Sequence, residues 1–213
     1  MNMKHLRLLA SIIILICAGQ VTRAQLVRFN VGIEAGALGG YMMTESRLSP
    51  GFDYGGYGGA NIEVRIGRIF GVFGEAVYSY QTGMQTLLTD DGFSSGIRAG
   101  ITRQYMHIPL GIQLWMGRSA LFQAGFQQSI LLSSRYSEEG MAESISPDEG
   151  ALKYYTSIMA GFKFNLGRVV YINVEGTYGL SPAYVVTGHG APVITASVGL
   201  GFRVYSYRKS AFK

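Results

Sequence analysis

The chain has 213 residues, a usual length for one domain, and its composition is unusual for a soluble protein. It contains 30 glycines, 12% of its residues are aromatic, and only 15% are charged. Beyond residue 24 no run of 18 or more apolar residues occurs, so the sequence excludes membrane-spanning helices.

Residues 1–24 are predicted to be a secretory signal peptide. A basic start is followed by an almost wholly apolar run from Leu8 to Ala18, and Thr22-Arg23-Ala24 offers a small-residue cleavage site before Gln25. A lipoprotein signal is the alternative, because Cys17 follows an aliphatic run, but Ile16 stands where a lipobox requires a small residue. The apolar run is also shorter than the roughly 20 residues of a spanning helix.

Removal of this segment changes the charge and the redox chemistry of the chain. The segment holds Lys4, Arg7 and Arg23 and no acid, so the net charge falls from +5 to +2. The high isoelectric point therefore indicates no nucleic-acid partner. Cys17 is the only cysteine, so residues 25–213 can form no disulfide.

Residues 25–213 are predicted to form one domain, an all-β, eight-stranded antiparallel up-and-down transmembrane β-barrel in the outer membrane. An apolar exported chain without spanning helices can satisfy its backbone inside lipid only as a closed barrel. Most of the eight expected strands alternate apolar and polar residues, as Ile62, Val64 and Ile66 do with their neighbours. The strands are expected at 26–37, 53–66, 69–81, 97–116, 119–134, 151–165, 169–181 and 192–205.

The connections between these segments differ in length. Three are short and share one dipeptide, Gly67-Arg68, Gly117-Arg118 and Gly167-Arg168, where glycine supplies the positive φ of a tight hairpin. The other four are long, near 38–52, 82–96, 135–150 and 182–191. A soluble sandwich would also alternate, but it would mix long and short loops at both ends. Tight turns at one end are typical of outer-membrane barrels, in which that end faces the periplasm.

Aromatic residues are expected to form two girdles at the membrane interfaces. The candidates near the long loops are Tyr78, Tyr80, Tyr154 and Tyr178, and those near the tight turns are Phe70, Trp115, Phe164 and Phe202.

One segment resembles a known family. Tyr105-Met106-His107-Ile108-Pro109-Leu110-Gly111-Ile112 is similar to the Tyr-x-x-Ile-Pro-Leu signature of small outer-membrane barrels of Bacteroidota, the PorT-like family, and Val198-Gly199-Leu200-Gly201-Phe202 is similar to its last strand. His107 stands where members more often carry a carboxylate or an amide, and the chain continues beyond Tyr205. The resemblance implies an eight-stranded barrel with both termini inside the cell envelope, and it implies no single activity.

Ten charged residues are predicted to face the lumen. The interpretation favoured here is a structural network of paired charges, because eight strands leave an interior that side chains fill and enclosed charges must be paired. A proton or ion path is the alternative. The ten residues are Arg28, Glu34, Glu63, Arg65, Glu75, Arg103, Lys153, Lys163, Glu175 and Arg203.

Two histidines follow the signal segment. His107 is expected to be a hydrogen-bonded lumen residue, and a metal site would need further ligands, so neither a metal nor a cofactor is expected. His189 lies in the last long connection near Ser181 and Ser197, which invites comparison with lipid-A-modifying barrel hydrolases. That connection supplies no acid for a triad, so no catalytic residue is expected.

The third long connection is acidic, with Glu138, Glu139, Glu143, Asp148 and Glu149 and no base within 137–150. A solvated loop is expected; calcium binding is an alternative, without the spacing of an EF-hand. The expected partners are outer-membrane lipid and lipopolysaccharide, with a protein partner possible through the outer loops. The predicted function is a non-enzymatic structural or interaction role with a closed lumen, and the alternatives are a rim-active lipid- or peptide-modifying enzyme and a narrow pore.

Overall fold

The computed structural model describes residues 26–42, 51–88, 94–117, 119–138, 153–181, 184–186 and 189–210. The predicted signal peptide and most of the acidic connection lie outside these residues. The barrel strands are β1 (Leu26–Met42), β2 (Gly51–Ile66), β3 (Phe70–Leu88), β4 (Ser94–Met116), β5 (Ala120–Glu138), β6 (Tyr154–Asn165), β7 (Val170–Gly179) and β10 (Val193–Ser210).

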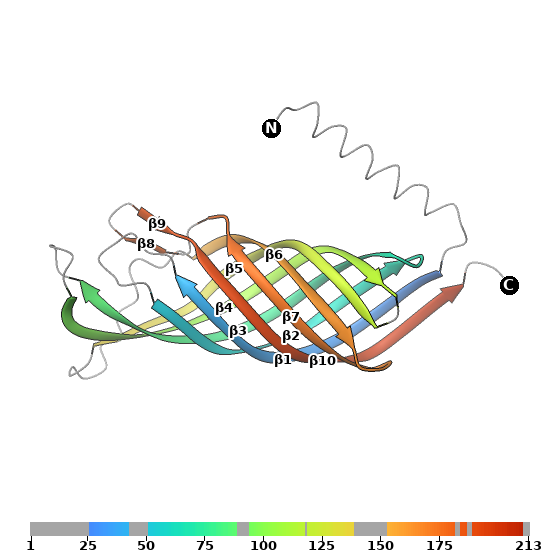
Figure 1. Cartoon of the computed structure of the whole chain (residues 1–213), viewed down its shortest axis with the longest axis horizontal. Coiled ribbons are helices and arrows are strands. Elements are labelled where there is room, and N and C mark those ends of the chain that lie inside the picture. The colour runs from blue at the N-terminus through green and yellow to red at the C-terminus, as the bar shows by residue number, and fades with distance from the viewer. Residues whose placement is uncertain are drawn as a thin grey trace, which may run out of the picture.

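These strands form one closed antiparallel ring in the order β1-β10-β7-β6-β5-β4-β3-β2 (Figure 1). Strands that neighbour one another in the sheet are also successive barrel strands in the chain, and β10 closes the ring on β1. The predicted eight-stranded up-and-down barrel is therefore confirmed. A separate two-stranded hairpin, β8 (Tyr184–Val186) and β9 (His189–Ala191), occupies the last long connection. Within the described part of the chain, no helix has the length and apolarity needed to cross a membrane.

Several strands run further than the sequence pattern predicts. β3 continues to Leu88 instead of ending at residue 81, and β10 continues to Ser210 instead of ending at 205. Backbone pairing does not require alternating polarity, so it persists where the strands leave the apolar band. On β10 a bulge lies opposite Val31 and Gly32, and beyond it the strand still pairs with the start of β1.

The three Gly-Arg connections form the tight turns of the barrel. Gly67, Gly117 and Gly167 have φ values of 71°, 80° and 148°, which L side chains rarely adopt. Figure 1 shows the start of β1 and the end of β10 at the same end of the barrel. The end that carries these turns is called the tight-turn end below, and the opposite end is called the long-loop end.

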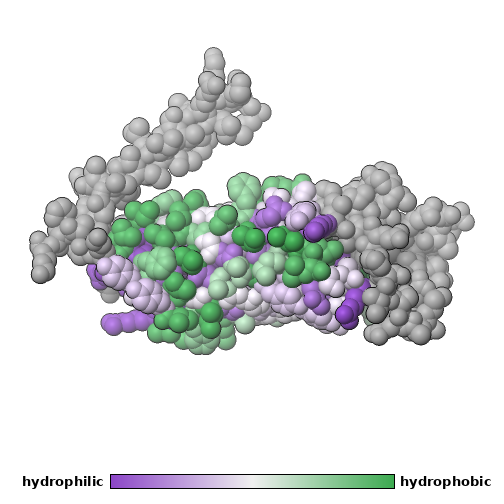
Figure 2. Space-filling model, turned by 180° about the vertical axis from the view of Figure 1, so that it is seen from behind, coloured by the Kyte–Doolittle hydropathy of each residue, from purple (hydrophilic) through white to green (hydrophobic). Residues whose placement is uncertain are grey.

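Apolar side chains gather over the outer wall of the barrel (Figure 2). The predicted girdle residues Tyr78, Tyr154, Phe164 and Phe202 are exposed on this wall, as a lipid-facing position requires. Trp115 is different: its side chain points into the lumen and is only 6% exposed. Its assignment to the girdle is wrong, because position 115 shares the inward face of β4 with Gln113 and His107.

Inward aromatic rings occupy space that neighbouring glycines leave open. A Cβ atom on Gly201 would collide with the ring of Tyr171, and one on Gly199 would collide with the hydroxyl of Tyr57. This complementarity lets rings from β7 and β2 lie across the lumen. The interior is therefore packed, although most of its buried residues are polar.

Candidate functional site: the polar lumen

The alternation of side chains carries the candidate residues into the lumen. Glu34, Glu63, Glu75, Arg103 and Lys163 are all buried. Arg28, Arg65, Glu175 and Arg203 are half-buried on the same inward face. Lys153 departs from the prediction: it lies just before β6 at the long-loop end, is exposed, and stands 5.6 Å from the ring centre of Tyr154. Because β6 begins only at Tyr154, position 153 is at the rim rather than inside the barrel.

Lys163 is the centre of the charge network. Its Nζ lies 2.7 Å from Glu75, 3.4 Å from Glu63 and 3.7 Å from Glu34, so three strands supply carboxylates to one ammonium group. The lysine side chain is 0% exposed and the three carboxylates are at most 2% exposed. An ammonium group enclosed in this way is tolerated only when it is paired.

Amide and hydroxyl groups complete the bonding of these carboxylates. Gln113 and Asn30 donate to the two oxygens of Glu63 over 3.3 Å each. Tyr171 donates its hydroxyl to Glu34 over 3.1 Å. Asn61 and Asn173 donate further bonds to Glu34 at 3.4 Å. We call Lys163, its three carboxylates and these donors the central layer of the lumen.

Glu175 borders the central layer without a basic partner. Gln123 donates to its carboxylate over 3.1 Å and Asn173 over 3.4 Å, and among the described residues no lysine or arginine nitrogen lies within 4 Å of it. Four carboxylates thus face two bases, Lys163 and Arg203, the latter 3.6 Å from Glu63. The predicted mutual neutralisation is incomplete here, because the remaining inward bases lie toward the two ends of the barrel.

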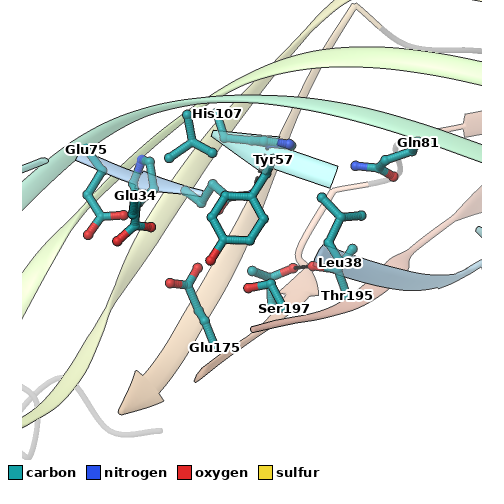
Figure 3. Close-up of a pocket in the computed structure, with 13 residues that line it drawn as sticks. Glu34, Leu38, Tyr57, Glu75, Gln81, His107, Glu175, Thr195 and Ser197 are labelled. Carbon is teal, nitrogen blue, oxygen red and sulfur yellow. Dashed lines mark hydrogen bonds between the residues drawn. The ribbon is translucent and has the colours of Figure 1, made fainter. Parts of the chain in front are cut away.

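A small cavity lies on the long-loop side of the central layer (Figure 3). Glu34, Glu75 and Glu175 project into it, and the ring of Tyr57 stands between them with its hydroxyl pointing toward Glu175. Its volume is about 40 Å³, enough for a few water molecules. The cavity can hydrate the surplus carboxylate, and it is far smaller than a pocket that binds an organic substrate.

His107 is buried beside this cavity, as the alternation predicts. Its Nε2 lies 2.8 Å from the hydroxyl of Ser79 and its Nδ1 2.7 Å from that of Ser129, so both ring nitrogens are hydrogen-bonded. Its ring also stacks on Tyr105 at 5.6 Å. Both serines are 0% exposed. The histidine therefore bridges β3 and β5 inside the wall and is closed to a substrate at the rim.

A further ion pair lies in the lumen toward the long-loop end. Arg103 Nη1 lies 3.3 Å from Asp53 Oδ2, with side-chain exposures of 3% and 10%. Asp53 was not among the predicted lumen charges, although the predicted second strand includes it. It shares the inward parity of Glu63 on β2 and is buried.

Sequence reasoning also missed the uncharged members of the network. They share the inward parity of the predicted charges on their strands, so the alternation itself was the signal that could have found them. They are Asn30, Asn61, Gln113, Gln123, Gln127, Tyr171 and Asn173.

The two serines considered for catalysis lie in different places. Ser181, which follows β7, accepts a hydrogen bond from the backbone N–H of Thr156. Ser197 lines the lumen cavity instead. The side chain of His189 lies outside the described residues. Across the described ranges, no three His, Cys, Asp or Glu side chains are placed to hold a metal ion.

Comparison with solved structures finds other barrels at low sequence identity. Ail of Yersinia pestis, solved in complex with the heparin analogue sucrose octasulfate, is 13% identical, with a TM-score of 0.43 over 86% of this chain and 99% of that one. Neisserial surface protein A is 11% identical, with a TM-score of 0.47 over 81% and 96%. The outer membrane protease OmpT from Escherichia coli is 9% identical, with a TM-score of 0.32 over 85% and 97%.

No curated protein matches the chain. A family profile described as "Outer membrane protein beta-barrel domain" matches residues 20–185, which is most of the sequence and seven of the eight barrel strands. The closed ring of tilted strands and its apolar outer wall agree with that match. The chain belongs to this family of outer-membrane β-barrels and is a protein of the outer membrane.

Proposed function

We propose that the protein is a non-enzymatic, non-conducting barrel of the outer membrane that acts through contacts made at its long-loop end. The central layer carries this proposal. Lys163 is fully buried between Glu34, Glu63 and Glu75, and such an arrangement blocks the passage of ions along the axis.

The side chains of the central layer come from six of the eight barrel strands. Glu34 comes from β1, Glu63 from β2, Glu75 from β3, Gln113 from β4, and Lys163 from β6, while Tyr171 and Asn173 come from β7. Groups from six strands converge on the axis of the barrel, with the small cavity beside them. An eight-stranded ring has just enough interior for such side chains. Planar-bilayer recording of the purified barrel tests this reading, which predicts no steady current.

An enzymatic role at the rim has weaker support. Nucleophilic catalysis requires a reactive serine beside a base that a substrate can reach. The Ser–His contacts of the described residues join His107 to Ser79 and Ser129, and all three are buried in the lumen.

The motif from Tyr105 to Ile112 supports placement among the PorT-like barrels of Bacteroidota. Tyr105, His107 and Pro109 point inward, where they pack against the lumen cavity and Tyr155, while Ile108 and Leu110 face lipid. The motif is thus a stretch of barrel wall rather than a catalytic element. The proposed partners remain outer-membrane lipid, lipopolysaccharide and a protein bound through the outer loops.

The proposal fixes an orientation that labelling can test. Lys153 and Arg168 are exposed residues at opposite ends of β6, and residues 25–213 contain no cysteine. On intact cells a membrane-impermeant maleimide should label Lys153→Cys, whereas Arg168→Cys should react only after the outer membrane is permeabilised. Long loops face outward and tight turns face the periplasm in barrels of this kind. The opposite labelling pattern would refute the orientation and with it an outward-facing contact surface.

A further inference from the structure

The tight-turn end of the barrel is strongly basic. Its described residues include Arg28 near the start of β1, Arg65 near the end of β2, and Arg203 and Arg208 on the last part of β10. Arg68 and Arg168 add further bases in the turns. Within the described ranges, the only ion pair that any of these arginines forms joins Arg203 to Glu63, at 3.6 Å.

Three of the arginines lie in one row across the sheet. Arg28 is the direct partner of Arg65 in the β1–β2 pairing and of Arg208 in the β1–β10 pairing. The bulge in β10 brings position 208 to the same inward face as position 28, as the hydrogen bond from Ser206 to Asn30 beside it shows. Side chains directly opposite one another in neighbouring strands are about 4.5–5.5 Å apart at Cβ, and like charges in that position repel.

Several nitrogen atoms of this cluster are buried and make no hydrogen bond. The Nε atoms of Arg28 and Arg65 and the Nε1 of Trp115 have no hydrogen bond within the described part of the chain. The Nε of Arg203 has none either, although it lies 3.6 Å from Glu63 in an ion pair. Trp115 is 6% exposed, and the Arg203 side chain is 8% exposed. The guanidinium groups of Arg65 and Arg203 lie 4.3 Å and 6.0 Å from the centre of the Trp115 ring. Buried donors of this kind normally have an acceptor.

We propose that the arginine row, Arg208–Arg28–Arg65, together with Arg203 and Trp115, binds a phosphate group at the periplasmic mouth of the lumen. Guanidinium groups offer planar forks of N–H donors that match the oxygens of phosphate. Several arginines from three strands suit an anion with two charges and several acceptor oxygens, because each guanidinium group can bind a different pair of phosphate oxygens. The bound anion would also relieve the repulsion within the row.

Trp115 makes the site directly observable, because it is the only tryptophan of the chain. The full barrel, refolded in maltoside micelles that contain no phosphate, should show a saturable change of tryptophan fluorescence on addition of inorganic phosphate. Sodium chloride at the same ionic strength should give no such change. Arg28→Gln should weaken phosphate binding by about tenfold or more, the loss expected for a charge-assisted hydrogen bond. Arg168→Gln, an exposed turn arginine at the same end, should bind as the wild type does.

A second experiment distinguishes binding of free phosphate from binding of a lipid headgroup. If phosphatidylglycerol added to the micelles produces the fluorescence change and inorganic phosphate does not, and Arg28→Gln removes it, the source is a lipid headgroup. The proposal is overturned if neither ligand acts, if chloride acts equally, or if Arg28→Gln binds with unchanged affinity. Folding of each variant is checked by the faster migration of unboiled samples on gels, and Arg208→Gln replaces Arg28→Gln if the latter does not fold.

Discussion

Replacing Lys163 by methionine should lower the free energy of unfolding by about 3–5 kcal/mol, the usual cost of leaving a buried ion-pair partner unbalanced. Methionine is close to lysine in volume, so packing is largely kept and the charge is lost. Glu34, Glu63 and Glu75 would then face one another without the ammonium group that now lies within 3.7 Å of each.

Denaturant unfolding of the refolded barrel measures this loss, and Lys153→Met, at the exposed position just before β6, is the matched control. The control should unfold at the same denaturant concentration as the wild type, because Lys153 is exposed and forms no ion pair among the described residues. The loss of unfolding free energy in Lys163→Met should become smaller at acidic pH, because protonated carboxyl groups no longer repel one another. Equal stabilities of the two variants would show that the central layer does not hold the barrel together.

Replacing Gly36 by alanine should destabilise the barrel by about 1–3 kcal/mol through overpacking. A Cβ atom on Gly36 would lie 2.5 Å from the Gly199 Cα and 2.8 Å from the ring of Tyr57, and it would collide with the carbonyl oxygen of Val198. Two of these atoms belong to the backbone of β10, so β1 and β10 would have to separate at the seam that closes the ring.

Gly40→Ala is the control for this prediction, because it makes the same change on the same face of the same strand. A Cβ atom there would meet Thr195 Cγ2 at 3.5 Å and the Ile194 carbonyl at 3.8 Å, which are ordinary contacts. Denaturant midpoints should therefore fall for Gly36→Ala and stay near the wild-type value for Gly40→Ala. A midpoint for Gly36→Ala equal to that of its control would contradict the packing described for Tyr57.

The fold could be predicted from the sequence because the barrel repeats one simple rule. Alternating polarity identifies the strands, and the three Gly-Arg dipeptides identify the end that carries the tight turns. Strand ends were predicted less well: β3 continues to Leu88 and β10 to Ser210, since pairing outside the apolar band depends on the neighbouring strand. The polarity pattern of one strand carries no information about the length of the strand that pairs with it.

The candidate site could be predicted as a set of inward charges, but its pairing could not. Lys163 meets carboxylates 88, 100 and 129 positions away in the chain, so the shear of the barrel decides which charges share a level. For the same reason Glu175 receives amides from Gln123 and Asn173 instead of a base. The bulge that turns Arg208 inward leaves no visible signal in the alternation, so the arginine row could not be found from the sequence.

Planar-bilayer recording tests the closed lumen most directly. Wild-type barrel that migrates on gels as a folded protein should pass no steady current, and neither should the Lys153→Cys variant, whose labelling in the same membranes shows that it is inserted. The reason is the central layer around Lys163, whose neighbouring cavity has a volume of only about 40 Å³. A steady, ion-selective conductance of the wild type that changes with Lys163→Met or Glu63→Gln would contradict this account and identify the lumen as a pore.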